Sequence, residues 1–264
     1  MTCVNCSTEG EGRFCSNCGQ PLRVKRLGWK EGFQDFWARI YGFDGMFPRT
    51  FRDLTLRPGF AARQFIDGNR ARYYGPVGYF FLMVTCFLLL LSLLGVNYID
   101  YMKSLQEGLP AQEESKLNND IRLFAADNIK LVVFLIIPFQ AFAARYFFFR
   151  KQGLNYLEHS VLPLYVMGHW YWVHMAESVF YYFTKTTMAA SMHILFVALY
   201  MGYGYTSFIP SQARWKTFLK GIGVQVVGYL GFFIVIVIVT IITVIIVGLI
   251  DPSALDAIRP SNNK

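Results

Sequence analysis

The stretch VGYFFLMVTCFLLLLSLLGV, residues 77–96, is predominantly apolar and carries no charged side chain. A bilayer core of about 30 Å is crossed by about 20 helical residues, each rising about 1.5 Å. Lipid offers the backbone no hydrogen-bond partner, so a spanning segment must satisfy its own amides and carbonyls, as a helix does. Residues 77–96 therefore predict a transmembrane helix and an all-α integral membrane protein.

Four further apolar runs are long enough to cross a bilayer, and they extend over residues of about 131–149, 161–183, 188–209 and 225–250. Pro138 interrupts the first of these four runs. The composition agrees: 54% of residues are hydrophobic and 16% are charged, against about 25% charged in ordinary soluble proteins. The sequence thus predicts a five-helix transmembrane bundle over 77–250, and excludes a disordered chain or a disulfide-rich secreted scaffold.

Positive charge predicts how this bundle is oriented. Most of the 25 Lys and Arg residues lie in 1–76 and in the loops 145–160 and 210–224, which share one side of the membrane. Positively charged loops stay in the cytoplasm. We therefore expect a multi-pass protein of the cytoplasmic (inner) membrane, with its N-terminus cytoplasmic and the tail 251–264 external. The net charge of +8 fits this topology and contact with anionic lipid, and no nucleic-acid partner is expected.

Four of the five cysteines form a C-x2-C-x8-C-x2-C pattern at the N-terminus, which predicts a zinc ribbon over 1–22; they are Cys3, Cys6, Cys15 and Cys18. Paired thiolates at this spacing suit a tetrahedral Zn²⁺ site. Disulfides or a redox dithiol are the alternatives, but a cytoplasmic head lies in a reducing compartment. A site closed by four thiolates is structural, and its folding should depend on the metal.

Residues 27–76 contain short amphipathic stripes that lead to the first span. Trp29, Phe33, Phe36, Trp37 and Ile40 form one such stripe, and a second follows Pro48 with Phe51 and Leu54. Aromatic residues opposite arginine are typical of helices that lie in the lipid headgroup region. Docking of these helices onto the cytoplasmic ends of the spans is the alternative, and one helix can do both.

The third predicted span is the most polar and supplies the candidate functional residues. His169, His174 and Glu177 lie within it, Glu158 and His159 lie at its cytoplasmic end, and His193 lies on the next predicted span. His174 and Glu177 are three residues apart, so they share one helical face, whereas His169 lies further round. An ionisable side chain at membrane depth is costly, which makes it a candidate for function. Three interpretations stay open: a proton or ion relay, a second metal site formed between helices, and hydrogen bonds that only set the packing. Glu177 can also reach toward Lys185 at the outer surface.

The order of several motifs resembles one bacterial family. The motifs are Cys18–Gly19–Gln20, Arg57–Pro58–Gly59, Gly68-x-Arg70-x-x-Tyr73-x-x-Pro76, and the run Asn155–Tyr156–Leu157–Glu158–His159. The chain is similar to small multi-pass membrane proteins that carry an N-terminal zinc ribbon and a domain of unknown function. This resemblance implies the zinc ribbon, the approach segment and the bundle, and it implies no activity.

Three classes of function fit these features. A membrane-anchored scaffold or regulator, whose zinc ribbon binds a cytoplasmic partner, ranks first because the thiolate site is closed and no catalytic set is visible. A small-solute or lipid transporter that uses the polar third span is second, and the absence of an internal repeat weakens it. An intramembrane enzyme that uses Glu158, His159 and His174 ranks last.

Overall fold

The computed structural model describes residues 2, 8–17, 22, 46–67, 73–105, 123, 128–210 and 213–250. The chain divides into two compact units, Met1–Pro48 and Arg49–Lys264. Over the described residues the regular structure is helical and contains no strand; an isolated antiparallel bridge joins Thr2 and Glu9. The expected all-α fold is confirmed for this part of the chain.

In the N-terminal unit, Cys15 and Leu22 are buried against each other. The Leu22 amide donates a hydrogen bond to the Arg13 carbonyl at 3.0 Å. Cys3, Cys6 and Cys18, the aromatic stripe from Trp29 to Ile40, and the tail 251–264 lie outside the described residues. The zinc ribbon and the external tail therefore stay predictions.

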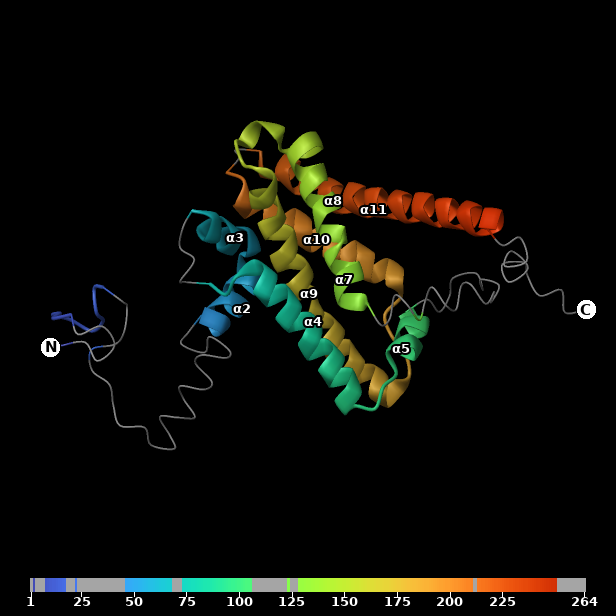
Figure 1. Cartoon of the computed structure of the whole chain (residues 1–264), viewed down its shortest axis with the longest axis horizontal. Helices are drawn as coiled ribbons and strands as arrows, with labels where there is room; N and C mark the ends of the chain where they lie inside the picture. Colours follow the sequence, from blue (N-terminus) through green and yellow to red (C-terminus); the bar gives the residue numbers. More distant parts are fainter. Residues whose placement is uncertain are drawn as a thin grey trace, which may run out of the picture. The chain divides into compact units, whose positions relative to one another are not determined.

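Figure 1 labels the main helices. In chain order the helical elements are α2 (Met46–Leu56), α3 (Pro58–Ile66), α4 (Pro76–Leu93), α5 (Tyr98–Leu105), α7 (Ile129–Phe134), α8 (Ile136–Ala143), the π-helical turn η2 (Ala144–Phe148), the short 3₁₀ turn η3 (Arg150–Gln152), α9 (Tyr156–Thr184), α10 (Ala190–Phe208) and α11 (Arg214–Ile250). Within the larger unit, α9 packs against α4, α8 and α10, while α11 packs against α8 and α10. The long helix α9 thus lies at the centre of the contacts that form the core.

The second predicted span is broken near its start, between α7 and α8. Helix α7 ends at Phe134 and α8 begins at Ile136, so that Leu135 joins them. Proline has no amide hydrogen, and its ring clashes with the carbonyl four residues earlier. For Pro138 that carbonyl belongs to Phe134, which accounts for a break at this position.

Helix α9 begins earlier than the apolar pattern predicts, because a capping box fixes its first turn. The Asn155 side chain accepts a hydrogen bond from the Glu158 amide at 2.9 Å. The Glu158 carboxylate accepts one from the Asn155 amide at 2.7 Å. This reciprocal pair satisfies two amides that a helix N-terminus would otherwise leave without partners. The helix therefore starts at Tyr156.

Helices α2 and α3 dock onto α9 and α10. The hydroxyl groups of Tyr200 and Tyr203 donate to the carbonyls of Leu54 and Leu56, at 2.7 and 2.5 Å. These carbonyls lie in the last turn of α2, where a helix leaves four carbonyls without internal partners. Leu54 is fully buried. Of the two arrangements expected for this segment, the described part adopts docking onto the bundle.

Three helical segments are long and apolar enough to cross a membrane: Pro76–Leu93, Ile129–Phe148 and Arg214–Thr243. They correspond to the first, second and fifth predicted spans. Helices α9 and α10, at the positions of the third and fourth predicted spans, are not among these three. The polar groups of α9, which include His159, His169, His174 and Glu177, account for its lower hydropathy.

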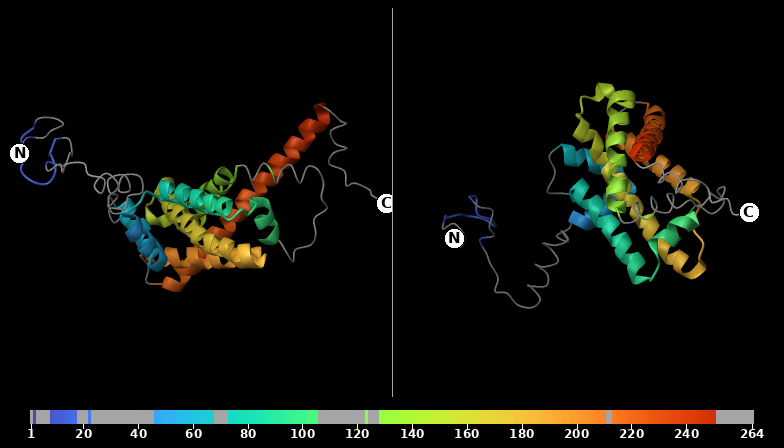
Figure 2. Two further views of the ribbon diagram at one scale, coloured as in Figure 1. Left: turned by 90° about the horizontal axis from the view of Figure 1, so that it is seen from below. Right: turned by 45° about the vertical axis from the view of Figure 1, so that its right-hand side comes forward.

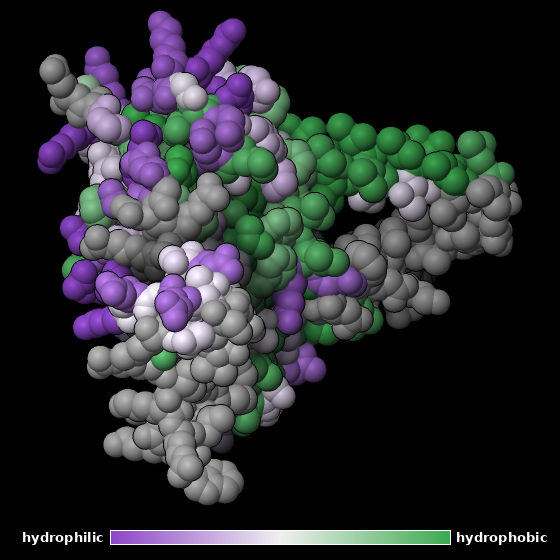
Figure 3. All heavy atoms as spheres, turned by 60° about the vertical axis from the view of Figure 1, so that its left-hand side comes forward, coloured by the Kyte–Doolittle hydropathy of each residue, from purple (hydrophilic) through white to green (hydrophobic). Residues whose placement is uncertain are grey.

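Helix α11 begins at Arg214 and not near Gln225, and its first turns pack on α8 and α10. Its later residues, from Phe233 to Val239, are all exposed. Figures 1 and 2 both show α11 extending beyond the other helices of the larger unit. Figure 3 shows that the surface of this extension is apolar. Such a surface is compatible with contact to the hydrocarbon of a bilayer.

Candidate metal centre

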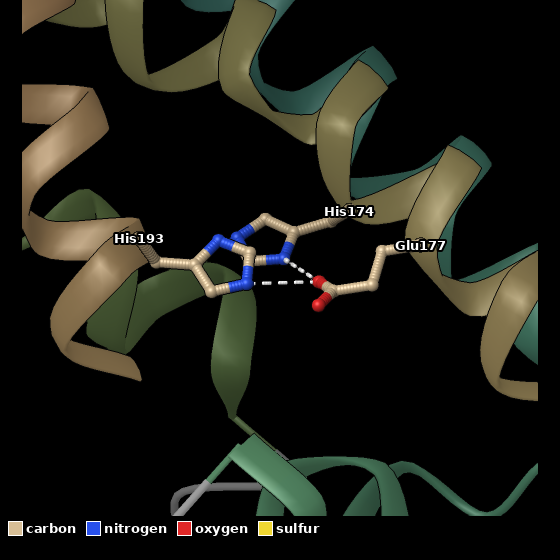
Figure 4. A group of neighbouring side chains, drawn as sticks. All are labelled: His174, Glu177 and His193. Carbon is tan, nitrogen blue, oxygen red and sulfur yellow. Dashed lines mark ion pairs between the residues drawn. The ribbon is translucent and has the colours of Figure 1, made fainter. Parts of the chain in front are cut away.

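Three metal-ligating side chains converge between α9 and α10 (Figure 4). His174 and Glu177 lie three residues apart on α9, and His193 lies in the first turn of α10. His193 Nε2 lies 2.9 Å from Glu177 Oε2, and His174 Nδ1 lies 3.9 Å from the same oxygen. One donor atom from each residue falls within 4.8 Å of the other two.

The chain reversal between α9 and α10 explains why these residues meet. Helix α9 ends at Thr184, and the next residue, Lys185, has a φ of 57° that places it in the left-handed region. Helix α10 then begins at Ala190 and runs back along α9. His193 therefore lies beside the last turns of α9, where Glu177 and His174 face it. The connection is short, so the two helices can only be neighbours.

Both oxygens of the Glu177 carboxylate accept a hydrogen bond. The Tyr101 hydroxyl, from α5, donates to Oε2 at 2.9 Å, and the Met188 amide donates to Oε1 at 2.5 Å. Burial, followed by the neighbouring charge of Glu177, raises the pKa of the Tyr101 hydroxyl, so it stays protonated and donates. The side chain of Glu177 is 9% exposed. Two donors thus fix the orientation of this buried carboxylate.

The two imidazole rings are stacked, with centroids 4.7 Å apart and planes 15° from parallel. Tyr101 also contacts His174 Nδ1 at 3.3 Å. His193 Nε2 lies within hydrogen-bond distance of Glu177, whereas its Nδ1 has no hydrogen-bond partner among the described residues. A buried ring nitrogen without a hydrogen bond is costly. His193 therefore has the capacity for a further partner.

Two imidazole nitrogens and one carboxylate oxygen are a donor set that suits Zn²⁺. Ligand bonds to zinc are about 2.0–2.2 Å long. The two histidine nitrogens lie 2.9 and 3.9 Å from the Glu177 oxygen. Small side-chain movements would therefore let all three donor atoms bind one ion. Three protein ligands leave a fourth tetrahedral position open, as in catalytic zinc sites.

The other predicted polar residues lie elsewhere and do not join this group. Glu158 caps α9, as described above. His159 is buried, and its Nδ1 has no hydrogen-bond partner in the described part of the chain. His169 lies between Thr55 Oγ1 at 3.0 Å and the Tyr79 hydroxyl at 2.8 Å, and so links α9 to α2 and α4. The five residues predicted as one cluster therefore occupy three separate places.

Lys185 is not the partner of Glu177. Its ammonium group lies 5.5 Å from the ring centroids of Tyr181 and Tyr182, while Glu177 contacts Tyr101, His193 and the Met188 amide. Cation–π contacts of this kind stabilise lysine at a partly exposed position. The sequence alternative in which Glu177 reaches toward Lys185 is therefore wrong. The Lys185 ammonium group instead contacts the tyrosine rings at the end of α9.

Sequence reasoning placed His193 on the neighbouring span but did not include it in the predicted cluster, and it missed Tyr101. The signal for His193 was available, since it is another ionisable residue in an apolar run. Tyr101 had no such signal, because it lies in the short helix α5 in a segment predicted as a loop. Its role depends on α5 packing near α9, where its ring lies 5.7 Å from that of Tyr181.

A second polar network lies in α2, where Asp53 is fully buried. The Tyr73 hydroxyl donates to its carboxylate at 2.8 Å, and Arg52 and Arg57 lie at 3.1 and 3.3 Å. Burial alone would raise the pKa of Asp53. The hydrogen bonds from Tyr73 and Arg52 and the charge of Arg57 outweigh it and hold that pKa below its usual range. Asp53 is therefore ionised and joins α2 to the segment before α4.

Residues 44–88 match the model of a family described as protein of unknown function (DUF3667). The matched region contains α2, α3 and most of α4, and therefore includes Asp53, Tyr73 and Tyr79. No curated protein and no solved structure matches the chain. The similarity thus covers the docked helices and the first apolar helix, and it carries no activity. The metal-ligating residues lie outside the matched region.

Proposed function

We propose that this chain is a membrane protein whose helical bundle binds a divalent transition-metal ion, Zn²⁺ in the first place, through His174, Glu177 and His193. One observation carries the proposal. Donor atoms of three metal-ligating residues, from two helices, lie within 4.8 Å of one another in a largely buried place. The metal would draw its ligands from helices that already pack against each other.

Neighbouring groups support the ligands in the way that metal sites require. Groups that hydrogen-bond to a ligand fix its orientation and strengthen its binding. The Tyr101 hydroxyl and the Met188 amide do this for Glu177. When bound, the ion would supply a Lewis acid with an open coordination position. The chain's own contribution is to hold the three donors in place and to exclude water around them.

Packing alone is the competing account of the same residues. A neutral histidine paired with a buried carboxylate can join two helices without any metal. That account leaves His193 Nδ1 without a hydrogen bond among the described residues. A metal ion would neutralise the buried charge of Glu177, which otherwise lacks a positively charged lysine or arginine partner among the described residues. The donor chemistry therefore favours the metal.

The test is to count bound zinc in purified full-length protein by inductively coupled plasma mass spectrometry. We expect His193→Gln and Glu177→Gln each to lose one equivalent of zinc relative to the wild type. The matched control is His169→Gln, on the same helix, which should retain the full amount because His169 binds Thr55 and Tyr79 instead. Unchanged zinc in both site variants, with normal elution on size exclusion, would refute the proposal.

The proposed arrangement in the membrane has five spans in the bacterial inner membrane, with α9 and α10 joining the three apolar segments. Two observations support it. The Lys and Arg residues gather in 1–76, 145–160 and 210–224, which share one side when α9 and α10 both cross, so that the connection between these helices, with Lys185 alone, lies on the other side. The bilayer also tolerates polar residues that face the interior of a bundle, and Glu177 and His193 are buried between helices.

The zinc ribbon at 1–22 supports a second proposal, a scaffold or regulator that binds a cytoplasmic protein. The C-x2-C-x8-C-x2-C spacing favours it, since Cys3, Cys6, Cys15 and Cys18 provide two thiolate pairs. Crosslinking from the head of the full chain in cells should recover a partner that Cys3→Ser loses together with one equivalent of zinc. Recovery of the same partner without that zinc would contradict a metal-dependent head.

A further inference from the structure

An apolar cavity of about 200 Å³ adjoins the candidate metal centre. Side chains from α4, α5, α7, α8, α9, α10 and α11 line it, including Phe87, Met102, Ile136 and Val197. His174 and His193 also form part of its wall. The cavity thus has a mainly apolar lining with two metal-ligating groups in one place.

The lining determines what such a cavity can hold. A cavity retains water only if two to four polar partners are available, and an apolar cavity of ~150 Å³ stays dry and takes up a small hydrocarbon. The present cavity is slightly larger, so it has room for a segment of an alkyl chain but not for a whole diacyl lipid. The two histidines in its wall lie together, with ring centroids 4.7 Å apart, which suits a ligand with one polar end.

We propose that this cavity binds the alkyl chain of a single amphiphile, whose oxygen-bearing head group, a carboxylate or a phosphate, lies at His174 and His193. Both head groups offer the hard, anionic oxygen that Zn²⁺ accepts at an open coordination position. The inference rests on the proposed function, because the head group would be bound by the ion that His174, Glu177 and His193 hold. A bilayer is the concentrated source of such chains.

The alkyl chain of the ligand can enter where the cavity approaches the surface of the helical bundle. Ile194 lines the cavity and is 55% exposed, whereas Val197, one turn further along α10, is 3% exposed. The cavity therefore extends from a lipid-accessible side of α10 toward the buried centre. A ligand that enters beside Ile194 would pass along α10 toward His193, which lies next to Ile194 in sequence.

The experiment uses full-length protein in nanodiscs and measures photolabelling in two arms. One arm contains a free fatty acid with a diazirine on its chain, and the other contains a phospholipid with the same diazirine chain. Mass spectrometry then locates the labelled residues. We expect labelling at cavity-lining residues, such as Met102 or Ile136, and the more strongly labelling arm identifies the source of the amphiphile.

Two neighbouring residues of α10 give a matched pair of variants. Ile194→Trp places a larger ring at the wall of the cavity, and Leu195→Trp adds the same ring at a position that is 50% exposed and is not part of the lining. A misfit in an apolar pocket costs about tenfold in binding for a single methylene. We therefore expect at least about tenfold less cavity labelling in Ile194→Trp, and unchanged labelling in Leu195→Trp. Because Ile194 is half-exposed, this variant should fold.

The same samples are assayed for zinc, which separates the two proposals. If Ile194→Trp abolishes the cavity labelling and His193→Gln weakens it, both the metal centre and the ligand cavity are supported. Cavity labelling in protein that binds no metal in the bundle would overturn the metal centre and leave the chain-binding cavity standing. Bound metal with labelling confined to the exposed face of α11, or unchanged in Ile194→Trp, would overturn the present inference alone.

Discussion

Asp53 shows how one buried charge can join segments of this protein. It receives a hydrogen bond from Tyr73 and lies beside the exposed guanidinium groups of Arg52 and Arg57. Its pKa is lowered, because these partners outweigh the effect of burial. Asp53→Asn should therefore destabilise the protein by about 2 kcal/mol, since hydrogen bonds to a charged group contribute about 1.5–3 kcal/mol. The measurement is thermal unfolding in detergent.

The pH dependence of this effect follows from the direction of the shift. A lowered pKa stabilises the folded state above the pKa of unfolded aspartate, about 3.9, and this stabilisation is lost as the pH falls through the lower, folded-state pKa. The difference between wild type and Asp53→Asn should thus be full at pH 5–7 and shrink below about pH 4. Asp67→Asn, in an exposed pair with Arg63, should cost about 0.5 kcal/mol or less.

The Tyr101 hydroxyl provides a separate test of the metal centre. Loss of a group that orients a metal ligand typically weakens metal affinity by about 10–100-fold. Tyr101→Phe removes the hydroxyl that donates to Glu177 and should weaken zinc binding by that factor, as measured by chelator competition. Tyr182→Phe, whose half-exposed ring lies under Lys185, should leave the affinity unchanged. Equal zinc affinities of Tyr101→Phe and Tyr182→Phe would show that Tyr101 does not support the metal ligands.

The residues of the metal centre could be predicted only in part from the sequence. The spacing of His174 and Glu177 placed both on one face of a helix, and the structure shows them facing the same neighbours. His193 and Tyr101 come from different elements, 19 and 73 residues from His174 in sequence, and only tertiary packing brings them to Glu177. His169 lies on the same helix but about 140° further round, at about 100° per residue, and the structure places it against Thr55 and Tyr79 instead.

At the scale of elements, the close approach of α3 to α10 depends on Gly59. A Cβ atom at this position would lie 1.9 Å from the Gly204 carbonyl oxygen and 2.4 Å from the Phe208 nitrogen. Both are backbone atoms, so the helices would have to separate. Gly59→Ala should therefore cost at least about 2 kcal/mol, measured by thermal unfolding. Gly75→Ala, where a Cβ meets nothing within 4 Å, should be close to neutral.

The elements themselves were predicted best where apolar runs are long. Hydropathy located α4 to within a few residues, and Pro138 marked the break between α7 and α8. The ends were less well predicted, because they depend on other groups: Asn155 and Glu158 cap α9, and the early turns of α11 carry Arg214, Lys216 and Lys220 while packing on α8 and α10. Helix α5 was missed because it is short and its burial comes from tertiary contacts.

At the scale of the whole molecule, the proposed topology predicts which loops are accessible from outside. In spheroplasts treated with a membrane-impermeant thiol reagent, Lys185→Cys should be labelled and Lys151→Cys should be protected until the membrane is permeabilised. The reason is that the positively charged loop 145–160 stays in the cytoplasm. Wild-type protein should remain unlabelled in intact spheroplasts. Labelling of Lys151→Cys from outside would reverse the proposed orientation.

The central claim is that His174, Glu177 and His193 hold a metal ion inside the bundle. An anomalous difference map at the zinc edge, from crystals of the zinc-loaded full-length protein, tests it most directly. The account predicts a peak between the three side chains, within about 2.0–2.2 Å of one donor atom of each. A map with no peak there, while His193 and Glu177 remain paired as they are in Figure 4, would contradict it.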